Sequence, residues 1–302
     1  MDLIYIPLLP INKPDFVKMK ILFTLLLLLP IQISAQEVIR TDTTTKYVRP
    51  KYYELGAGFN FSTFRDFATS PLIYSGLGGQ FVLGILRKDN QIESNFTVRF
   101  SSGVYTNSNY PDERTPGSVS AVFLSYGRLY RISSLSSDKW NFKVGGKIDL
   151  TGNLRQNQYL LNSGVGVESF QTLFASVKVT RDISRKTFKE KKFLFFRYKR
   201  VPQKRELSFQ LNPSVINNTF RNGYAYIGQS GVTGTNNLFD DYKFSTFSGF
   251  RINTALDYTR YLKNGNGIKF SYLWDAYKTG GSLPKFEMSH HIVQVALLFR
   301  VK

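Results

Sequence analysis

From residue 52 onward the chain alternates apolar side chains with polar or small ones, along segments of 12 to 16 residues. In 91–105 the apolar residues share one parity, and the other parity carries Glu93, Arg99 and neutral polar residues. A period of two indicates a β-strand whose two faces meet different surroundings. The pattern recurs in the segments 139–155, 267–278 and 289–301. We therefore expect an all-β fold.

Soluble β-sandwiches and membrane barrels both alternate in this way, so alternation alone leaves the choice open. Three features favour a transmembrane antiparallel β-barrel. The segments exceed the roughly 9–11 residues that a strand needs to cross hydrocarbon. Their apolar parity is nearly free of charge, and an export signal precedes a terminal strand that ends at Lys302. In such a barrel the apolar face meets lipid, and closing the sheet pairs every backbone group.

About ten strands are predicted, with eight or twelve as alternatives if one segment has been divided wrongly. They span residues 52–64, 72–87, 91–105, 118–131, 139–155, 170–182, 205–218, 246–262, 267–278 and 289–301. An even number places both ends of the barrel in the periplasm, where turns are short. The turns 88–90 and 264–266 fit this rule. The register of 118–131 stays open, because Val122 and Leu124 compete with Phe123 for the apolar face.

The N-terminus carries the only long apolar run, ILFTLLLLLPIQI at 21–33. Lys18 and Lys20 precede the run and Ser34-Ala35-Gln36 follows it, which is typical of a secretory signal peptide. We predict a signal peptide over 1–35, a periplasmic lead-in over 36–51 and the barrel over 52–302. An anchor that stays attached is the alternative. Met19 begins a complete signal by itself, so residues 1–18 are a candidate for a wrongly assigned upstream start.

The amino-acid composition excludes several kinds of functional site and partner. Cysteine is absent, which excludes a disulfide framework, a Cys-ligated metal and a catalytic thiol. The formal net charge of +19 would suggest nucleic acid in a cytosolic protein. An exported chain meets no nucleic-acid pool, so anionic lipid head groups or acidic partners are expected instead. No cofactor, metal or nucleic-acid partner is predicted.

The chain resembles the small outer-membrane β-barrel proteins of the Bacteroidota. The likeness rests on Ala35-Gln36 at the expected cleavage site, on the aromatic amphipathic strands and on the terminal ALLFRVK strand, and it covers about residues 19–302. It implies an outer-membrane location and no particular reaction. The chain departs from the common pattern of a terminal aromatic residue, because Phe299 lies three positions before the end.

Charges of both signs recur on the parity expected to face the barrel interior. The candidate cluster consists of Glu93, Arg99, Lys143, Lys147, Asp149, Lys269 and Asp275. Barrels of about eight strands are filled by side chains, and open aqueous channels need about sixteen. Ten strands therefore favour an interior packed with ion pairs and ordered water. A narrow pore that selects small solutes by charge is the alternative.

The two histidines, His290 and His291, are expected near the outer rim, where the last strand begins. A rim hydrolase would need His290 as its base, Ser289 as its nucleophile and Asp240, Asp241 or Asp275 as the carboxylate. No spacing matches a catalytic triad, and two histidines cannot supply the usual three-ligand zinc site. We therefore assign no catalytic residue and keep the rim hydrolase as a distant alternative.

The segment 184–206 is too long for a periplasmic turn. It carries ten Lys or Arg residues and only two Glu residues. Candidate contacts are Arg185, Lys186, Lys191, Lys192, Phe195, Phe196, Arg197, Lys199 and Arg200. Basic side chains reach anionic head groups while aromatic rings sit at the interface, so lipid is one expected partner. The second expected partner is another envelope protein, bound through 185–205. The alternative is that the segment binds nothing and only extends the two strands into solvent. The expected function is a non-enzymatic structural or accessory protein of the outer membrane.

Overall fold

The computed structural model describes residues 49–107, 116–157, 165–193, 195–223, 239 and 242–301. The expected signal peptide 1–35, most of the lead-in 36–51, Asp240 and Asp241 lie outside these residues. Within the described ranges, no helix is both long and apolar enough to cross a membrane.

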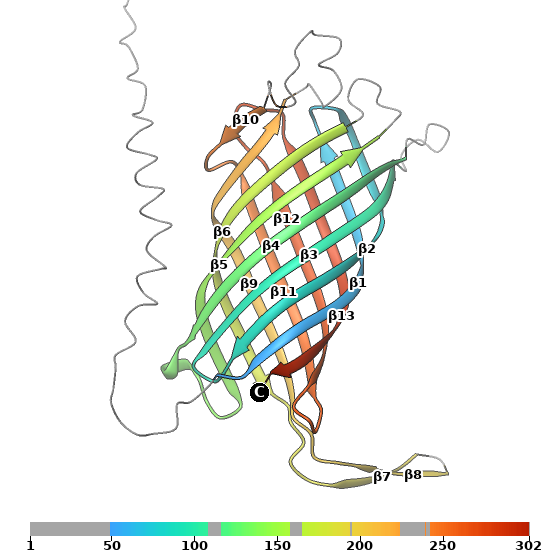
Figure 1. Ribbon diagram of the computed structural model, residues 1–302, viewed down its shortest axis with the longest axis vertical. Helices are drawn as coiled ribbons and strands as arrows, with labels where there is room; N and C mark the ends of the chain where they lie inside the picture. Colours follow the sequence, from blue (N-terminus) through green and yellow to red (C-terminus); the bar gives the residue numbers. More distant parts are fainter. Residues whose placement is uncertain are drawn as a thin grey trace, which may run out of the picture. The chain divides into compact units, whose positions relative to one another are not determined.

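Ten long strands of the described residues form a closed antiparallel barrel (Figure 1). They are β1 (Lys51–Asp66), β2 (Ser70–Lys88), β3 (Ile92–Asn107), β4 (Gly117–Arg131), β5 (Trp140–Gln156), β6 (Val165–Asp182), β9 (Arg205–Asn222), β11 (Phe250–Tyr261), β12 (Gly267–Lys278) and β13 (Phe286–Val301). Neighbouring strands follow chain order, β9 pairs with β6, and β13 pairs with β1 to close the ring. The predicted all-β barrel of ten strands is confirmed, and the alternatives of eight and twelve are wrong.

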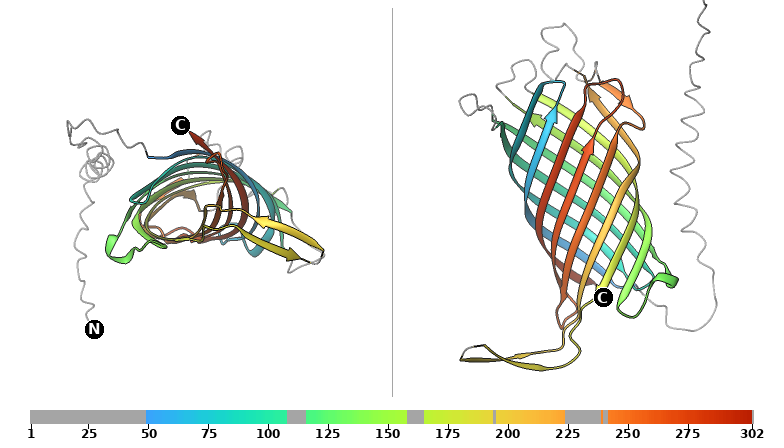
Figure 2. Two further views of the ribbon diagram at one scale, coloured as in Figure 1. Left: turned by 90° about the horizontal axis from the view of Figure 1, so that it is seen from below. Right: turned by 180° about the vertical axis from the view of Figure 1, so that it is seen from behind.

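The two ends of the barrel differ. We call the end at which β1 begins and β13 finishes the lower end, as drawn in Figure 1. There the connections β2–β3 and β11–β12 are tight turns, and a short 3-10 turn, η2 (Ser133–Leu135), lies between β4 and β5. The lower end also bears a separate hairpin of β7 (Lys189–Phe193) and β8 (Phe196–Arg200) (Figures 1 and 2). At the opposite, upper end the short strand β10 (Tyr242–Ser245) pairs with the end of β9.

Large apolar side chains cover the outside of the barrel. Along β1 the outward parity runs from Tyr53 to Phe61, and its large side chains are exposed. This span of nine residues matches the length that crosses a bilayer, about 9–11 residues for a tilted strand. Above it the outward side chains turn polar, and Thr63 Oγ1 lies 3.1 Å from Ser75 Oγ. On β1 the apolar band therefore ends below the upper rim.

The register of β4, left open by the sequence, is settled by the pairing. Val122, Leu124 and Tyr126 face outward, and Phe123 is buried inside the barrel. The guanidinium of Arg99 packs 4.3 Å from the ring centroid of Phe123. The interior accepts apolar residues here because ten strands enclose a packed space, and hydrophobicity therefore marks both faces of this strand.

Candidate functional site: the barrel interior

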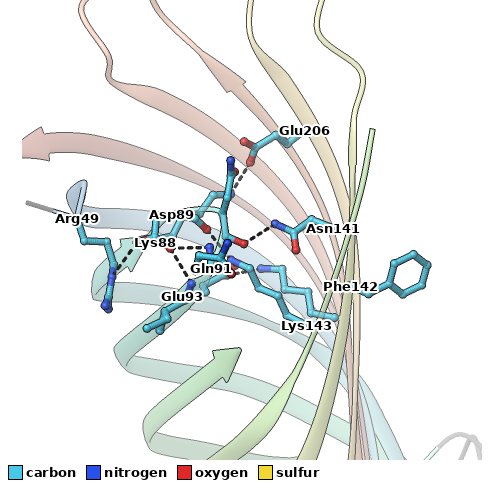
Figure 3. A network of polar contacts seen from close by, with 12 residues as sticks. Arg49, Lys88, Asp89, Gln91, Glu93, Asn141, Phe142, Lys143 and Glu206 are labelled. Atoms are coloured by element: carbon cyan, nitrogen blue, oxygen red, sulfur yellow. Dashed lines mark hydrogen bonds and ion pairs between the residues drawn. The ribbon is translucent and has the colours of Figure 1, made fainter. Parts of the chain in front are cut away.

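At the lower end the interior holds a chain of ion pairs (Figure 3). Glu93 of β3 accepts from Lys143 of β5 at 3.4 Å and from Lys178 of β6 at 2.5 Å. Lys143 also donates to the backbone carbonyl of Asp89 at 2.8 Å. Lys88 pairs with Glu206, across the barrel from β2 to β9. These contacts tie the turn between β2 and β3 to three other strands.

Asp89 fixes that turn. Its carboxylate accepts the backbone N–H groups of Gln91 and Ile92 at 2.7 and 2.6 Å and lies 3.3 Å from Arg49 Nε. Burial alone would raise the pKa of Asp89. The two backbone donors and the Arg49 guanidinium outweigh burial and hold the pKa below its usual value. Asp89 is therefore charged in the folded protein at neutral pH.

The centre of the interior is built around Arg251 of β11. Its Nε and Nη2 donate to the two carboxylate oxygens of Asp275 at 2.9 and 2.6 Å, and Nη1 donates to Thr151 at 3.0 Å. Asp149 lies 3.8 Å from the same guanidinium and accepts from Lys147 at 3.0 Å. Arg251 is 0% exposed, so this cluster is buried and its charges depend on one another.

A second charged group closes the upper part of the interior. Asp66 Oδ2 accepts from Arg155 at 2.7 Å, and Asp66 Oδ1 accepts from Arg221 at 2.8 Å. Arg155 Nε also donates to Glu168 at 3.0 Å. Packed around these charges are the buried residues Phe64, Tyr74, Tyr105, Val119, Phe170, Tyr277, Phe286 and Met288. Side chains thus fill the upper interior.

The seven residues of the predicted interior cluster all lie on inward-facing positions, but in separate groups. Lys147, Asp149 and Asp275 meet around Arg251. Glu93 and Lys143 pair near the lower end, and Lys269 pairs with Glu54 at 2.5 Å. Arg99 lies between the groups, with no hydrogen bond or ion pair among the described residues. The sequence prediction missed the upper group of Asp66, Arg155, Glu168 and Arg221.

The constellation predicted around His290 is assembled only in part: Asp275 is its pairing neighbour on β12, but Ser289 is not beside it. Strand β13 begins at Phe286, three residues earlier than predicted, and His290 lies inside the barrel at 3% exposure. Its Nδ1 is 2.7 Å from Ser62 Oγ. Ser289 faces the opposite side of the strand, where it accepts a hydrogen bond from Trp274 Nε1 at 3.0 Å. The expected position of His290 at the rim is therefore wrong. The carboxylate of Asp275 accepts two hydrogen bonds from Arg251.

The basic segment forms the hairpin β7–β8, in which Lys191 pairs with Tyr198 and Phe193 with Phe196. Arg185 and Gln203 pair at its base. Phe195 at the tip is 92% exposed, and the exposed Lys199 pairs with Glu190 at 3.3 Å. Lys186 is also exposed. The backbones of Lys191, Lys192, Phe196, Arg197 and Arg200 are described, but their side chains lie outside the described part.

Metal ligation has no support in the described ranges, where no three His, Cys, Asp or Glu side chains are grouped to hold an ion.

No family model and no curated protein sequence matches the chain. Among solved structures it is similar to the outer membrane protease OmpT of Escherichia coli, at 9% identity and a TM-score of 0.49, over 86% of this chain and 99% of that one. It is also similar to the transport unit of the autotransporter AIDA-I of Escherichia coli, at 6% identity and a TM-score of 0.42, over 89% and 95%. The translocator domain of the autotransporter NalP of Neisseria meningitidis matches at 10% identity and a TM-score of 0.37, over 94% and 98%. No activity of this chain follows from these likenesses.

Proposed function

We propose that the protein is a closed outer-membrane barrel that acts as a non-enzymatic structural or accessory subunit of an envelope assembly. The apolar outer band and the closed backbone ladder support residence in a membrane, because lipid requires every backbone group to be paired. The export signal read from the sequence supports the outer membrane of a Gram-negative cell, and the termini and tight turns at the lower end support a periplasmic position for that end. The Bacteroidota origin rests on the sequence resemblance.

The filled upper interior is the observation that carries this proposal. Arg251, Asp275, Asp66 and Arg221 each have at most 1% exposure, and aromatic rings pack against them. Ions cross a barrel through continuous water, as in porins of 16–18 strands or so. Buried ion pairs and packed aromatic rings across the upper interior block such a path, which favours a structural role over transport.

The hairpin supplies the surface through which a partner would bind. It stands off from the lower end of the barrel, and its two strands pair only with each other (Figure 2). An isolated two-stranded hairpin is marginally stable in water, so a bound partner would stabilise it. The excess of Lys and Arg over Glu in 184–206 favours an acidic partner.

Co-purification tests this contact. We expect native outer membranes in mild detergent to yield a stoichiometric envelope protein with the wild type. The quadruple variant K186Q/K191Q/K192Q/K199Q should reduce its recovery about tenfold or more, because charges at an interface set encounter and specificity. The matched control K139Q/K263Q removes two exposed charges at lower-end turns outside the hairpin and should leave recovery unchanged. Equal recovery with both variants would exclude the hairpin as the contact.

The second candidate is the narrow pore, favoured by a charged cavity of about 130 Å³ in the lower half of the interior. Planar bilayers separate the two functions. We expect the wild-type barrel to give no stepwise conductance, while a porin added to the same bilayer does. Steps that change size in Lys143→Gln or Lys147→Gln would replace the structural proposal with the pore.

A further inference from the structure

The lower-half cavity has an excess of cations on its wall. Its charged lining residues are Lys88, Arg99, Lys147, Lys178 and Lys269 against Glu54, Glu93 and Asp257. Most of the remaining lining is neutral and polar, including Ser125, Asn212 and Asn253. Such a cavity is hydrated, because a polar space of this size holds several waters.

Each lysine of the wall forms an ion pair with a carboxylate. Lys178 meets Glu93 and Lys269 meets Glu54, both at 2.5 Å. Lys88 pairs with Glu206 and Lys147 with Asp149. The lysines are therefore neutralised by contacts within the protein, and they do not account for the excess of charge.

Arg99 is the exception. It is 9% exposed, and its Nε is buried without an acceptor among the described residues. The carboxylates that act on it electrostatically are Asp275 and Asp149. Both are engaged by Arg251, and Asp149 also by Lys147. Three cations thus share these two carboxylates. Asp257, the remaining carboxylate of the wall, accepts from Ser271 at 2.6 Å and is not among the charges that act on Arg99, so one positive charge is locally unpaired at the upper end of the cavity. Burying a charge without a counter-charge is costly, so the site favours an added anion.

We propose that the cavity binds one small monovalent anion of the halide type beside the guanidinium of Arg99. A single excess charge matches a monovalent ion, and the volume accommodates the ion with a few waters of about 30 Å³ each. Asn212 and Asn253 on the same wall are joined by a hydrogen bond of 2.9 Å and offer neutral polar contacts. The site is separate from the hairpin and does not depend on the proposed partner.

The anion enters from the lower end. Lys88 and Lys269, toward that end, keep 18% side-chain exposure, and Arg251 above the cavity keeps none. Solvent therefore reaches the cavity from below, and the buried cluster closes it above. Binding would be reversible and periplasmic, without transport across the membrane.

Bromide provides the direct test on the wild-type protein. Crystals grown in sodium bromide should show an anomalous peak within hydrogen-bond distance of Arg99, about 3.5 Å for a halide. In detergent, the unfolding temperature should rise by a few degrees between 1 and 100 mM chloride, at constant ionic strength set by gluconate, because a ligand stabilises the state that binds it. Gluconate is too large for the cavity.

Two variants make the test specific. Arg99→Gln should lose both the peak and the chloride effect, while Arg181→Gln, on the outer surface beside Trp140, should keep both. Arg99→Lys retains the charge and should keep part of the chloride effect. A wild-type crystal with only waters beside Arg99, together with equal stability in chloride and gluconate, would overturn the proposal.

Discussion

Arg251→Met should lower the free energy of unfolding by about 3–5 kcal/mol, the usual cost of removing one partner from a buried ion pair. Arg251 donates two hydrogen bonds to Asp275 and is fully buried between β11 and the opposite wall. Methionine fills much of the same volume but removes both hydrogen-bond donors of Asp275, which then keeps only Arg99, to which it makes no hydrogen bond, as a nearby cation. Guanidinium titration of the refolded barrel, followed by the fluorescence of its two tryptophans, measures the loss.

The double variant R251M/D275L separates the charge effect from packing. It removes both partners and should recover most of the loss, to within about 1 kcal/mol of the wild type, because apolar replacements of buried pairs are often neutral. Asp149 keeps Lys147 at 3.0 Å in either variant. Lys278→Met is the exposed control, since its pair with Glu287 is 55% and 33% exposed. It should cost less than about 1 kcal/mol.

A small effect of Arg251→Met, equal to that of Lys278→Met, would mean that water hydrates the centre of the barrel. The occlusion on which the structural role rests would then be absent, and the pore would become the better proposal. The stability of one buried arginine therefore bears on function as well as on folding.

The fold was predictable because lipid imposes the alternation that defines each strand. The bounds of β12, residues 267–278, agree with the prediction at both ends. The predicted strand bounds were too short at the upper ends of several strands; on β1 the outward side chain there is polar, at Thr63, so the apolar alternation stops before the strand does. The backbone ladder continues there. Asp66 and Arg221 lie beyond the predicted ends of their strands, and Glu168 lies before the predicted start of its strand.

The sequence predicted which side chains of a strand face the interior, but it did not predict which of them form ion pairs across the interior. Parity places Lys269 and Glu54 inside, yet they come from β12 and β1, which are separated in the sheet by β13. Their contact depends on the tilt and closure of the barrel, which no local pattern encodes. For the same reason no local pattern indicated that Arg99 would lie inside the barrel without an ion pair among the described residues.

Gly76→Ala should prevent correct closure between β2 and β3, or cost about 3 kcal/mol where the barrel still forms, because backbone atoms cannot make room as side chains do. A Cβ built on Gly76 would overlap the carbonyl oxygen of Val104 and stand 2.8 Å from the Cα of Tyr105. Close approach of two backbones is a recognised reason for glycine within a strand. The folded fraction is measured by the heat-dependent shift of the barrel band on a gel, and the stability by guanidinium titration.

Gly79→Ala, three residues along the same strand, is the matched control. A Cβ at Gly79 faces outward and meets no atom within 4 Å. Alanine there should be neutral or slightly stabilising, by up to about 1 kcal/mol, because it restricts the unfolded chain. Two identical substitutions on one strand thus differ only in what their new methyl group meets. Equal stability of the two variants would mean that β2 and β3 lie farther apart at Gly76. The interior beside Tyr105 would then be less tightly packed than in this structure.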